Sequence, residues 1–308
     1  MTGDRLGVGV VGAGRVGAVL ANALRAVGHS VLGASGHSQV TRDRIDALLP
    51  GVPVLDVREV IERAELVLLT VPDDVLDDLV AGLARLGAWQ PGQIVVHTSG
   101  ARGTGVLEPA RAAGAIPLAV HPAMTFTGTS LDLARLVGCA FAVTGPAPVL
   151  PIGQALVVEL GGEPVVVAEE SRPLYHAALA HGANHLVVLV AQAAQALVAA
   201  GIPAPDRVLG PLLTAALDAA VRTAAVAGAG GVAGLTGPVV RADVGTVAMH
   251  LAELAALAGR DLSAADLPAA YRVLARSATS RALADARIRD DQAQLLLDVL
   301  AEPGAADR

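Results

Sequence analysis

Short, unbroken apolar runs alternate with amphipathic segments over the first half of the chain. Runs of this kind are typical of strands that are buried on both faces of a sheet. The segment Leu66–Thr70 is a clear example, because all but its last residue are large and apolar. The pattern predicts eight strands, at Gly3–Val11, Ser30–Ala34, Val52–Leu55, Leu66–Thr70, Ile94–His97, Ile116–Val120, Cys139–Thr144 and Pro164–Val167.

Helical periodicity fills most of the intervals between these strands. Val75–Leu86, for instance, has its apolar residues on one face. The expected helices are Val16–Val27, Thr41–Leu49, Val57–Arg63, Val75–Leu86, Thr104–Ala113 and Val149–Leu160. Alternation of strand and helix predicts an α/β domain, with a mostly parallel, doubly wound sheet covered on both faces.

The pattern changes after Glu169, where no further strand is indicated. Expected helices are Ser171–Ala200, Pro205–Val226, Pro238–Ala258, Ser263–Ser277 and Asp290–Leu300, and Ser263 with Asp266 resembles a capping box. The tail Glu302–Arg308 is expected to fray. We therefore predict two domains, an α/β domain at 1–169 and an all-helical domain at 170–308.

A glycine-rich turn links the first strand to the first helix, in a G-x-G-x-x-G pattern. In this pattern Gly12 allows a tight turn, Gly14 lets the backbone approach a pyrophosphate, and Gly17 lets the helix pack close to the strand. The helix would point its N–H groups and positive dipole end at the phosphates. The context favours a dinucleotide site over a turn of no function, with six cofactor-binding residues: Gly12, Ala13, Gly14, Arg15, Val16 and Gly17.

The end of the second predicted strand indicates which dinucleotide is bound. Sites for NAD carry an Asp or Glu there, which binds the ribose 2′-hydroxyl. No carboxylate is present in Ser35–Ser38, whereas Ser35, His37, Arg42 and Arg44 suit a 2′-phosphate. We therefore predict NADP(H), with Ser35 as the leading contact. The alternative is that Arg42 and Arg44 are solvated helix charges.

Composition leaves a membrane location to be considered, because 53% of the residues are hydrophobic and the mean hydropathy is +0.57. Leu186–Ile202 is the most apolar run, but it is Ala-rich and contains Gln192 and Gln195. We interpret it as a buried core helix rather than a span, which needs about 20 strongly apolar residues. The first strand begins too early to leave room for a signal peptide, so a cytoplasmic protein without membrane contact is expected.

Charge and rare residue types narrow the chemistry further. The net charge is −7 and only 2% of the residues are aromatic, which argues against nucleic-acid binding. All 22 basic residues are arginines, so lysine cannot be the proton donor of any reaction. Cys139 is the only cysteine and lies in an apolar run, so we expect an inert buried thiol, no disulfide and no Cys-ligated metal.

Polar residues follow three neighbouring strands, at the sheet edge where doubly wound folds bind ligands. The segments are Thr70–Asp73, His97–Ala101 and His121–Phe126. Turn formation explains Pro72 and Pro122, but His97, Ser99 and His121 are candidates for a cofactor or substrate role. From this edge we assign Val71, Pro72, Asp73, Ser99 and Gly100 to the cofactor, His121 and Ser99 to catalysis, and Thr125 to the substrate.

The helical half adds a second group of candidates. His176 and Asn184 share one face of the long helix and are further catalytic candidates. His181 and His185 have a spacing that could hold zinc, but no third ligand is evident, so no metal is expected. Arg241, in a Thr-Gly-Pro turn segment, could clamp a substrate carboxylate. The alternative for Arg241 is a structural ion pair with Asp243.

Six segments together resemble one protein group: Gly12–Gly17, Val71–Asp73, His97–Ala101, His121–Phe126, Tyr175–Ala178 with Asn184, and Leu235–Asp243. The chain is similar over nearly its whole length to Rossmann-like oxidoreductases whose C-terminal half is a helical domain of unknown function. This group is related to pyrroline-5-carboxylate reductase, ketopantoate reductase and 6-phosphogluconate dehydrogenase. The resemblance implies NADP binding, a dimerising helical domain and a cleft active site.

The resemblance has departures, and two functions remain open. Asn184 can fill the place of an Asn in these relatives, but Ala180 stands where some of them use Lys. The first hypothesis is an NADPH-dependent reductase of a C=O or C=N bond in a small carboxylate, with His121 or His176 as acid and Asn184 and Ser99 as orienting groups. The alternative is a non-catalytic NADP(H) sensor or scaffold. The apolar helical half predicts a homodimer through residues after 170.

Overall fold

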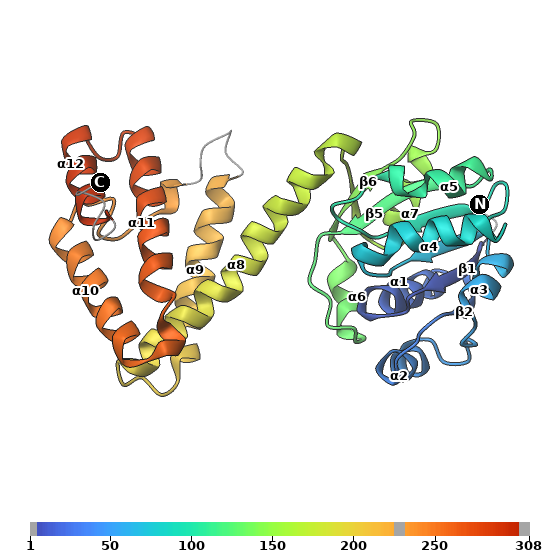
Figure 1. The fold of residues 1–308 in the computed structure, drawn as a ribbon, viewed down its shortest axis with the longest axis horizontal. Coiled ribbons are helices and arrows are strands. Elements are labelled where there is room, and N and C mark those ends of the chain that lie inside the picture. Colours follow the sequence, from blue (N-terminus) through green and yellow to red (C-terminus); the bar gives the residue numbers. More distant parts are fainter. Residues whose placement is uncertain (1–4, 225–231, 302–308) are drawn as a thin grey trace. The chain divides into compact units, whose positions relative to one another are not determined.

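The computed structural model describes residues 5–224 and 232–301. The chain forms two compact units, Met1–Gly182 and Ala183–Arg308, which are described separately (Figure 1). The expected tail 302–308, the start of the first expected strand at 3–4 and the last residues of the expected helix that ends at Val226 lie outside the described residues.

A seven-stranded sheet forms the centre of the first unit. The strands are β1 Gly7–Val11, β2 Ser30–Ala34, β3 Leu66–Leu69, β4 Ile94–His97, β5 Ile116–Pro122, β6 Ala140–Thr144 and β7 Glu163–Val166. Their order is β2-β1-β3-β4-β5-β6-β7. β1 to β5 are parallel, β6 is antiparallel to β5, and β7 is parallel to β6. The predicted fold class, a mostly parallel sheet followed by helices, is confirmed.

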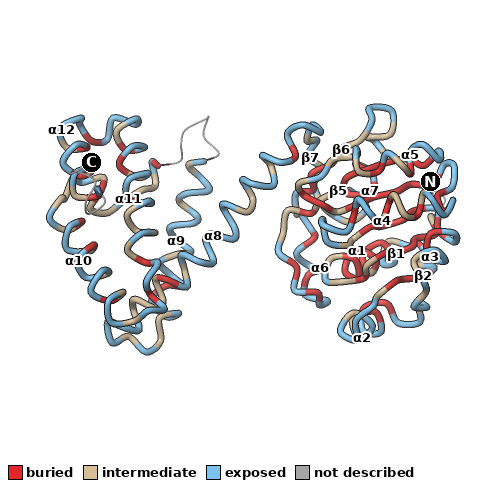
Figure 2. Tube along the Cα trace, viewed as in Figure 1, coloured by how far each residue is buried: buried red, intermediate tan, exposed pale blue. Residues whose placement is uncertain are grey.

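Helices cover both faces of this sheet and bury its apolar side chains (Figure 2). One face packs on α1 Arg15–Ala26, α2 Gln39–Leu48, α6 Leu131–Leu136 and α7 Leu150–Glu159. The other packs on α3 Val57–Arg63, α4 Asp73–Arg85, the 3₁₀ turn Thr104–Leu107 and α5 Glu108–Ala112. Successive residues of β3 alternate between the two cores, as the period of a strand requires.

One predicted strand is wrong. Val52–Leu55 makes only an isolated bridge, between Val54 and Ala34. Pro53 lies beside that bridge and has no N–H to donate to a ladder, which is sufficient reason for a strand not to form. The segment nevertheless lies beside the end of β2, and it brings the residues that follow it to the candidate cofactor site.

The second unit is helical where it is described. It contains the remainder of α8 Arg172–Ala199, then α9 Pro205–Ala224, α10 Val244–Arg260, α11 Leu267–Ala284 and α12 Asp290–Val299, with 3₁₀ turns at Val232–Gly234 and Leu262–Ala264. Its core includes Val247, Leu251, Ala282, Leu296 and Leu300.

Two expected helix starts in this unit are wrong, because side-chain caps act elsewhere. α10 begins at Val244 and not at Pro238, since Asp243 caps it by accepting hydrogen bonds from the Thr246 N–H and hydroxyl, at 3.0 and 2.7 Å. α11 begins at Leu267. Asp266 accepts from Gln192 at 2.7 Å, and Ser263 bonds to Asp261, so the expected capping box does not form.

The expectation of a buried core helix at Leu186–Ile202 is also wrong. Much of α8 is exposed in the single chain, including Val187 at 69% and Val188 at 50%. Among the described residues, Glu169–Ala199 is the stretch long and apolar enough to cross a membrane, and none of its most apolar window is buried. α8 is apolar around its circumference, and the helices of its own chain cover only part of it.

Candidate functional site

The glycine turn after β1 has the geometry that its sequence predicts. Gly12 has a φ of +83°, which an L side chain rarely adopts. A Cβ atom at Gly17 would overlap the hydroxyl of Thr70, whereas a Cβ at Gly14 would meet no atom closer than 3.8 Å. Gly17 is therefore required for close helix packing, and the space beside Gly14 is open.

Helix α1 presents an uncapped N-terminus to that open space. Gly14 is its N-cap residue, no side chain caps it, and no acidic residue lies in its first turn. Uncapped N–H groups and the positive helix end attract anions such as a pyrophosphate. Ala13 is buried and its N–H donates to the Ser35 carbonyl, so it shapes the turn, while Arg15 is exposed.

A cavity of about 760 Å³ opens at the carboxyl ends of β1 to β4. Its lining includes several predicted cofactor residues: Gly12, Gly14, Val16, Ser35, Val71, Pro72, Asp73 and Ser99. Thr70 fixes one wall, because its hydroxyl donates to the Gly12 carbonyl at 2.7 Å. Its volume is within the range of small-molecule sites, and it lies where doubly wound sheets bind their ligands.

The Ser35 hydroxyl is already engaged in the fold. Ser35 is buried, and its Oγ accepts a hydrogen bond from the Gly12 N–H at 3.1 Å. Arg42 is exposed, donates to the His37 carbonyl at 3.2 Å, and lines a separate, smaller cavity at the end of β2. Arg44 donates instead to the Gly128 carbonyl, so the two arginines serve different places.

Two carboxylates that were not predicted as site residues lie near the same strand end. Asp56 and Glu59 line a smaller cavity of about 300 Å³, together with Ser35, His37 and Arg42. The bridge from Val54 to Ala34 brings them there. Glu59 pairs with Arg63 at 3.2 Å. Arg42 and Asp56 therefore place side chains of opposite charge type beside the end of β2.

A hydrogen-bonded chain orders the loop after β4. The buried His97 accepts from the Ser99 N–H at Nδ1, at 3.2 Å, so its proton is on Nε2, which donates to the Gly103 carbonyl at 2.9 Å. The Ser99 hydroxyl donates to Asp73 at 2.8 Å and accepts from the Arg102 N–H. Burial lowers the pKa of His97 to about 4. His97 and Ser99 thus hold the loop in place.

His121, at the end of β5, lies among three groups that could carry chemistry. Its Nδ1 is 3.0 Å from the hydroxyl of Tyr175, and its ring is edge-to-face with His176, at a centroid distance of 6.2 Å. A Cβ at Gly100 would lie 2.6 Å from His176 and 3.0 Å from His121. Both imidazoles therefore pack against Gly100, the residue that follows Ser99 of the cavity lining.

The protonation of His121 follows from its surroundings. Burial, the Arg172 guanidinium and His176 lower the pKa of His121 to about 4. The imidazole is therefore neutral near pH 7. Burial also raises the pKa of Tyr175, which keeps its hydroxyl protonated. Tyr175 was not among the predicted site residues, because a lone tyrosine on an apolar helix resembles a core residue.

Arg172, the first residue of α8, is fully buried at the strand ends. Its guanidinium donates to the carbonyls of Ser99 at 2.9 Å, Ala119 at 2.7 Å and Ala142 at 3.0 Å, and to the Thr144 hydroxyl at 2.9 Å. One side chain thus ties together β5, β6 and the loop after β4. This role was not predicted from the sequence, since an arginine at the start of a helix is usually exposed.

The three remaining predicted residues are exposed. Thr125 is exposed in the loop after β5. Asn184 and Arg241 belong to the second unit, and both are exposed. Asp243 caps α10; no ion pair within 4.0 Å joins it to Arg241, but the Arg241 guanidinium is among the charges that lower the pKa of the Asp243 carboxyl. Within residues 5–224 and 232–301, no group of three potential metal ligands converges.

Comparison with family models matches residues 1–122 to a Rossmann-like domain and residues 139–278 to a domain of unknown function, DUF2520. No curated protein matches the sequence.

Three solved structures illustrate the likeness in fold. One is a Bacteroides fragilis protein described as an NADP oxidoreductase, with TM-score 0.70, 20% identity, and coverage of 89% of this chain and 98% of that chain. The second is an imine reductase from Myxococcus stipitatus in complex with NADP⁺, with TM-score 0.58, 18% identity, and coverage of 94% of this chain and 99% of that chain. The third is 1-pyrroline-5-carboxylate reductase from Streptococcus pyogenes, with TM-score 0.58, 17% identity, and coverage of 89% of this chain and 100% of that chain. At these identities the likeness concerns the fold.

Proposed function

Because this chain joins a Rossmann-like domain to the domain of unknown function DUF2520, we propose that it is an NADP(H)-dependent reductase of a C=O or C=N bond in a small molecule. The observation that carries the proposal is the uncapped N-terminus of α1 at the open face of Gly14, on a cavity of dinucleotide size. The bound nicotinamide would supply the hydride.

The chain's own residues would hold the acceptor and supply the proton. A neutral His121 can give one hydrogen bond to the substrate oxygen or nitrogen, and the Tyr175 hydroxyl fixes the plane of its ring. His176 is exposed beside it and is the second candidate acid. Ser99 acts through Asp73, so we propose it as a positioning residue.

The cofactor preference is proposed from the arginine at the end of β2. Arg42 is exposed, lines the smaller cavity there and can bind a 2′-phosphate in a charge-assisted contact. Arg241, also exposed, is the proposed clamp for a substrate carboxylate. We further propose a cytoplasmic homodimer, because the apolar surface of α8 is large for a soluble single chain.

The test is NADPH oxidation with a panel of 2-oxo acids, ketones and cyclic imines. We expect turnover with at least one class, and a loss of about 100-fold in His121→Ala, the effect typical of removing a hydrogen-bond donor that stabilises developing charge in the transition state. The neutral state of His121 and the absence of lysine favour the second candidate, a sensor of NADP(H). A sensor would bind NADPH tightly, but NADPH would not be oxidised in the presence of any substrate of the panel. This result would refute the reductase proposal.

A further inference from the structure

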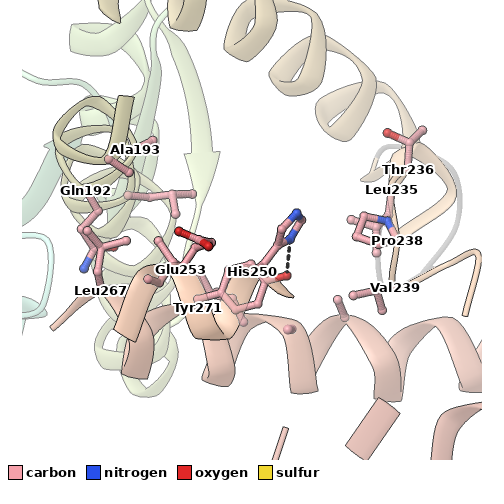
Figure 3. Close-up of a pocket in the computed structure, with 16 residues that line it drawn as sticks. Gln192, Ala193, Leu235, Thr236, Pro238, Val239, His250, Glu253, Leu267 and Tyr271 are labelled. Carbon is pink, nitrogen blue, oxygen red and sulfur yellow. Dashed lines mark hydrogen bonds between the residues drawn. The ribbon is translucent and has the colours of Figure 1, made fainter. Parts of the chain in front are cut away.

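The helical unit contains a cavity of its own, of about 580 Å³, formed by α8, α10, α11 and the turn before α10 (Figure 3). All of its lining residues lie in Ala183–Arg308. Most of the wall is apolar and includes five leucines, Leu189, Leu235, Leu254, Leu267 and Leu274. This volume is in the range of small-molecule sites, which combine an apolar wall with a few convergent polar groups.

Two polar groups of the wall are bound to each other. Nδ1 of His250 lies 2.9 Å from the Tyr271 hydroxyl, and the two rings are edge-to-face at a centroid distance of 5.8 Å. Both side chains are half-buried, and burial raises the pKa of Tyr271. The pair is therefore fixed, and it keeps an aromatic ring and an imidazole at the cavity (Figure 3).

Glu253 gives this wall its charge. It lies one turn after His250 on α10, and its carboxylate lies on the same side of the cavity as the His250–Tyr271 pair (Figure 3). The lining contains no arginine, and the chain has no lysine. Among the ion pairs of the described residues, none includes Glu253. The cavity therefore has one negative charge and no cation opposite it.

We propose that this cavity binds a small molecule with an apolar body and a protonated amine. The ammonium would pair with the Glu253 carboxylate and lie near the Tyr271 ring, where an aromatic face adds cation–π attraction. The apolar body would displace water from the leucine wall. A carboxylate in the same place would be repelled by Glu253. This inference concerns the helical unit and does not rest on the proposed hydride transfer.

The experiment compares three probes of one shape, phenylbutylamine, phenylbutanol and phenylbutyrate, by isothermal titration on the full-length protein without cofactor. We expect the amine to bind about three- to tenfold more tightly than the alcohol, the range for a partly exposed ion pair with an aromatic contribution. The carboxylate should bind most weakly. Glu253→Gln should abolish the preference for the amine but leave alcohol binding unchanged.

Two further variants separate a site from a general surface effect. Asp218→Asn removes an exposed carboxylate on α9, outside the cavity lining, and should change nothing. Ala193→Phe places a ring in the cavity and should weaken all three probes. The proposal is overturned if no probe binds, because the cavity would then be occupied by protein in solution. It is equally overturned if Glu253→Gln keeps the preference for the amine.

Discussion

The imidazole of His121 and the hydroxyl of Tyr175 come from a strand and a helix 54 residues apart, yet Nδ1 and Oη lie 3.0 Å apart. If this pair orients the substrate, Tyr175→Phe should lower kcat about tenfold and leave NADPH binding unchanged, since one neutral hydrogen bond contributes on the order of 1 kcal/mol. Single-turnover measurements of NADPH oxidation would test this. His181→Ala, on the same helix, serves as control, and an equal loss there would contradict a specific role for Tyr175.

The two glycines of the cofactor turn should respond differently to one methyl group. Gly14→Ala has room for its Cβ, so the variant should fold normally but bind NADPH about tenfold more weakly, because the methyl group takes space intended for phosphate. Gly17→Ala should lower the melting temperature, because its Cβ overlaps the Thr70 hydroxyl. Titration of NADPH fluorescence with thermal unfolding measures both effects. Unchanged NADPH affinity in Gly14→Ala would place the phosphates elsewhere.

Arg42 and Arg44 provide a matched pair for the cofactor preference. Arg42→Gln should weaken NADPH binding about tenfold without affecting NADH, as expected for one charge-assisted phosphate contact. Arg44→Gln should not change the ratio, because Arg44 donates to the Gly128 carbonyl. Competitive titration of both nucleotides gives the ratio. Tighter binding of NADH than NADPH by the unmodified protein would point to Asp56 and the ribose hydroxyl instead.

The buried His97 predicts a loss of stability in acid. Its pKa is about 4 in the folded chain and near 6.5 when unfolded, so the unfolded state binds more protons between these values. Stability from the neutral form is present above about pH 6.5 and is lost as the pH falls toward 4. Going from pH 7 to about pH 5 should cost on the order of 2 kcal/mol from this group. Urea unfolding at both pH values tests this, with His37→Gln as an exposed control and His97→Gln expected to flatten the dependence.

The exposed apolar surface of the helical unit predicts self-association. Leu217 and Val221 are one turn apart on α9 and are 51% and 61% exposed. Light scattering at micromolar concentration should give a dimer, and Leu217→Glu with Val221→Glu should shift it toward monomer while the helical circular dichroism is kept. A monomeric unmodified protein would refute the expected homodimer.

Apolar runs and helical periodicity in the sequence were enough to predict most of the fold, because the observed strands coincide with predicted apolar runs. They did not predict that β6 is antiparallel to β5, since a buried run is the same pattern in either chain direction. Val52–Leu55 has a strand-like composition but only one bridge. The exposure of α8 could not be predicted from a helix that is apolar on every side.

The site was predictable where it requires a positive φ, as at Gly12, or close helix packing, as at Gly17. It was less predictable where a side chain could serve either the ligand or the fold. Ser35 and Ser99 are polar and lie at strand ends, yet their hydroxyls bond to Gly12 and Asp73. Arg172, Tyr175 and Asp56 reach the site through tertiary structure, which no local pattern records.

The buried Arg172 also determines the electrostatic potential around the candidate site. Its guanidinium is surrounded by carbonyl oxygens and a hydroxyl, none of which carries a full charge. Guanidinium stays protonated throughout the physiological range, unlike a lysine ammonium, which titrates when it is buried. A chain that uses arginine for every basic residue therefore keeps this buried positive charge at the strand ends at any pH in that range. A negative charge that develops there during a reaction would be attracted by this guanidinium at every pH at which the protein is folded.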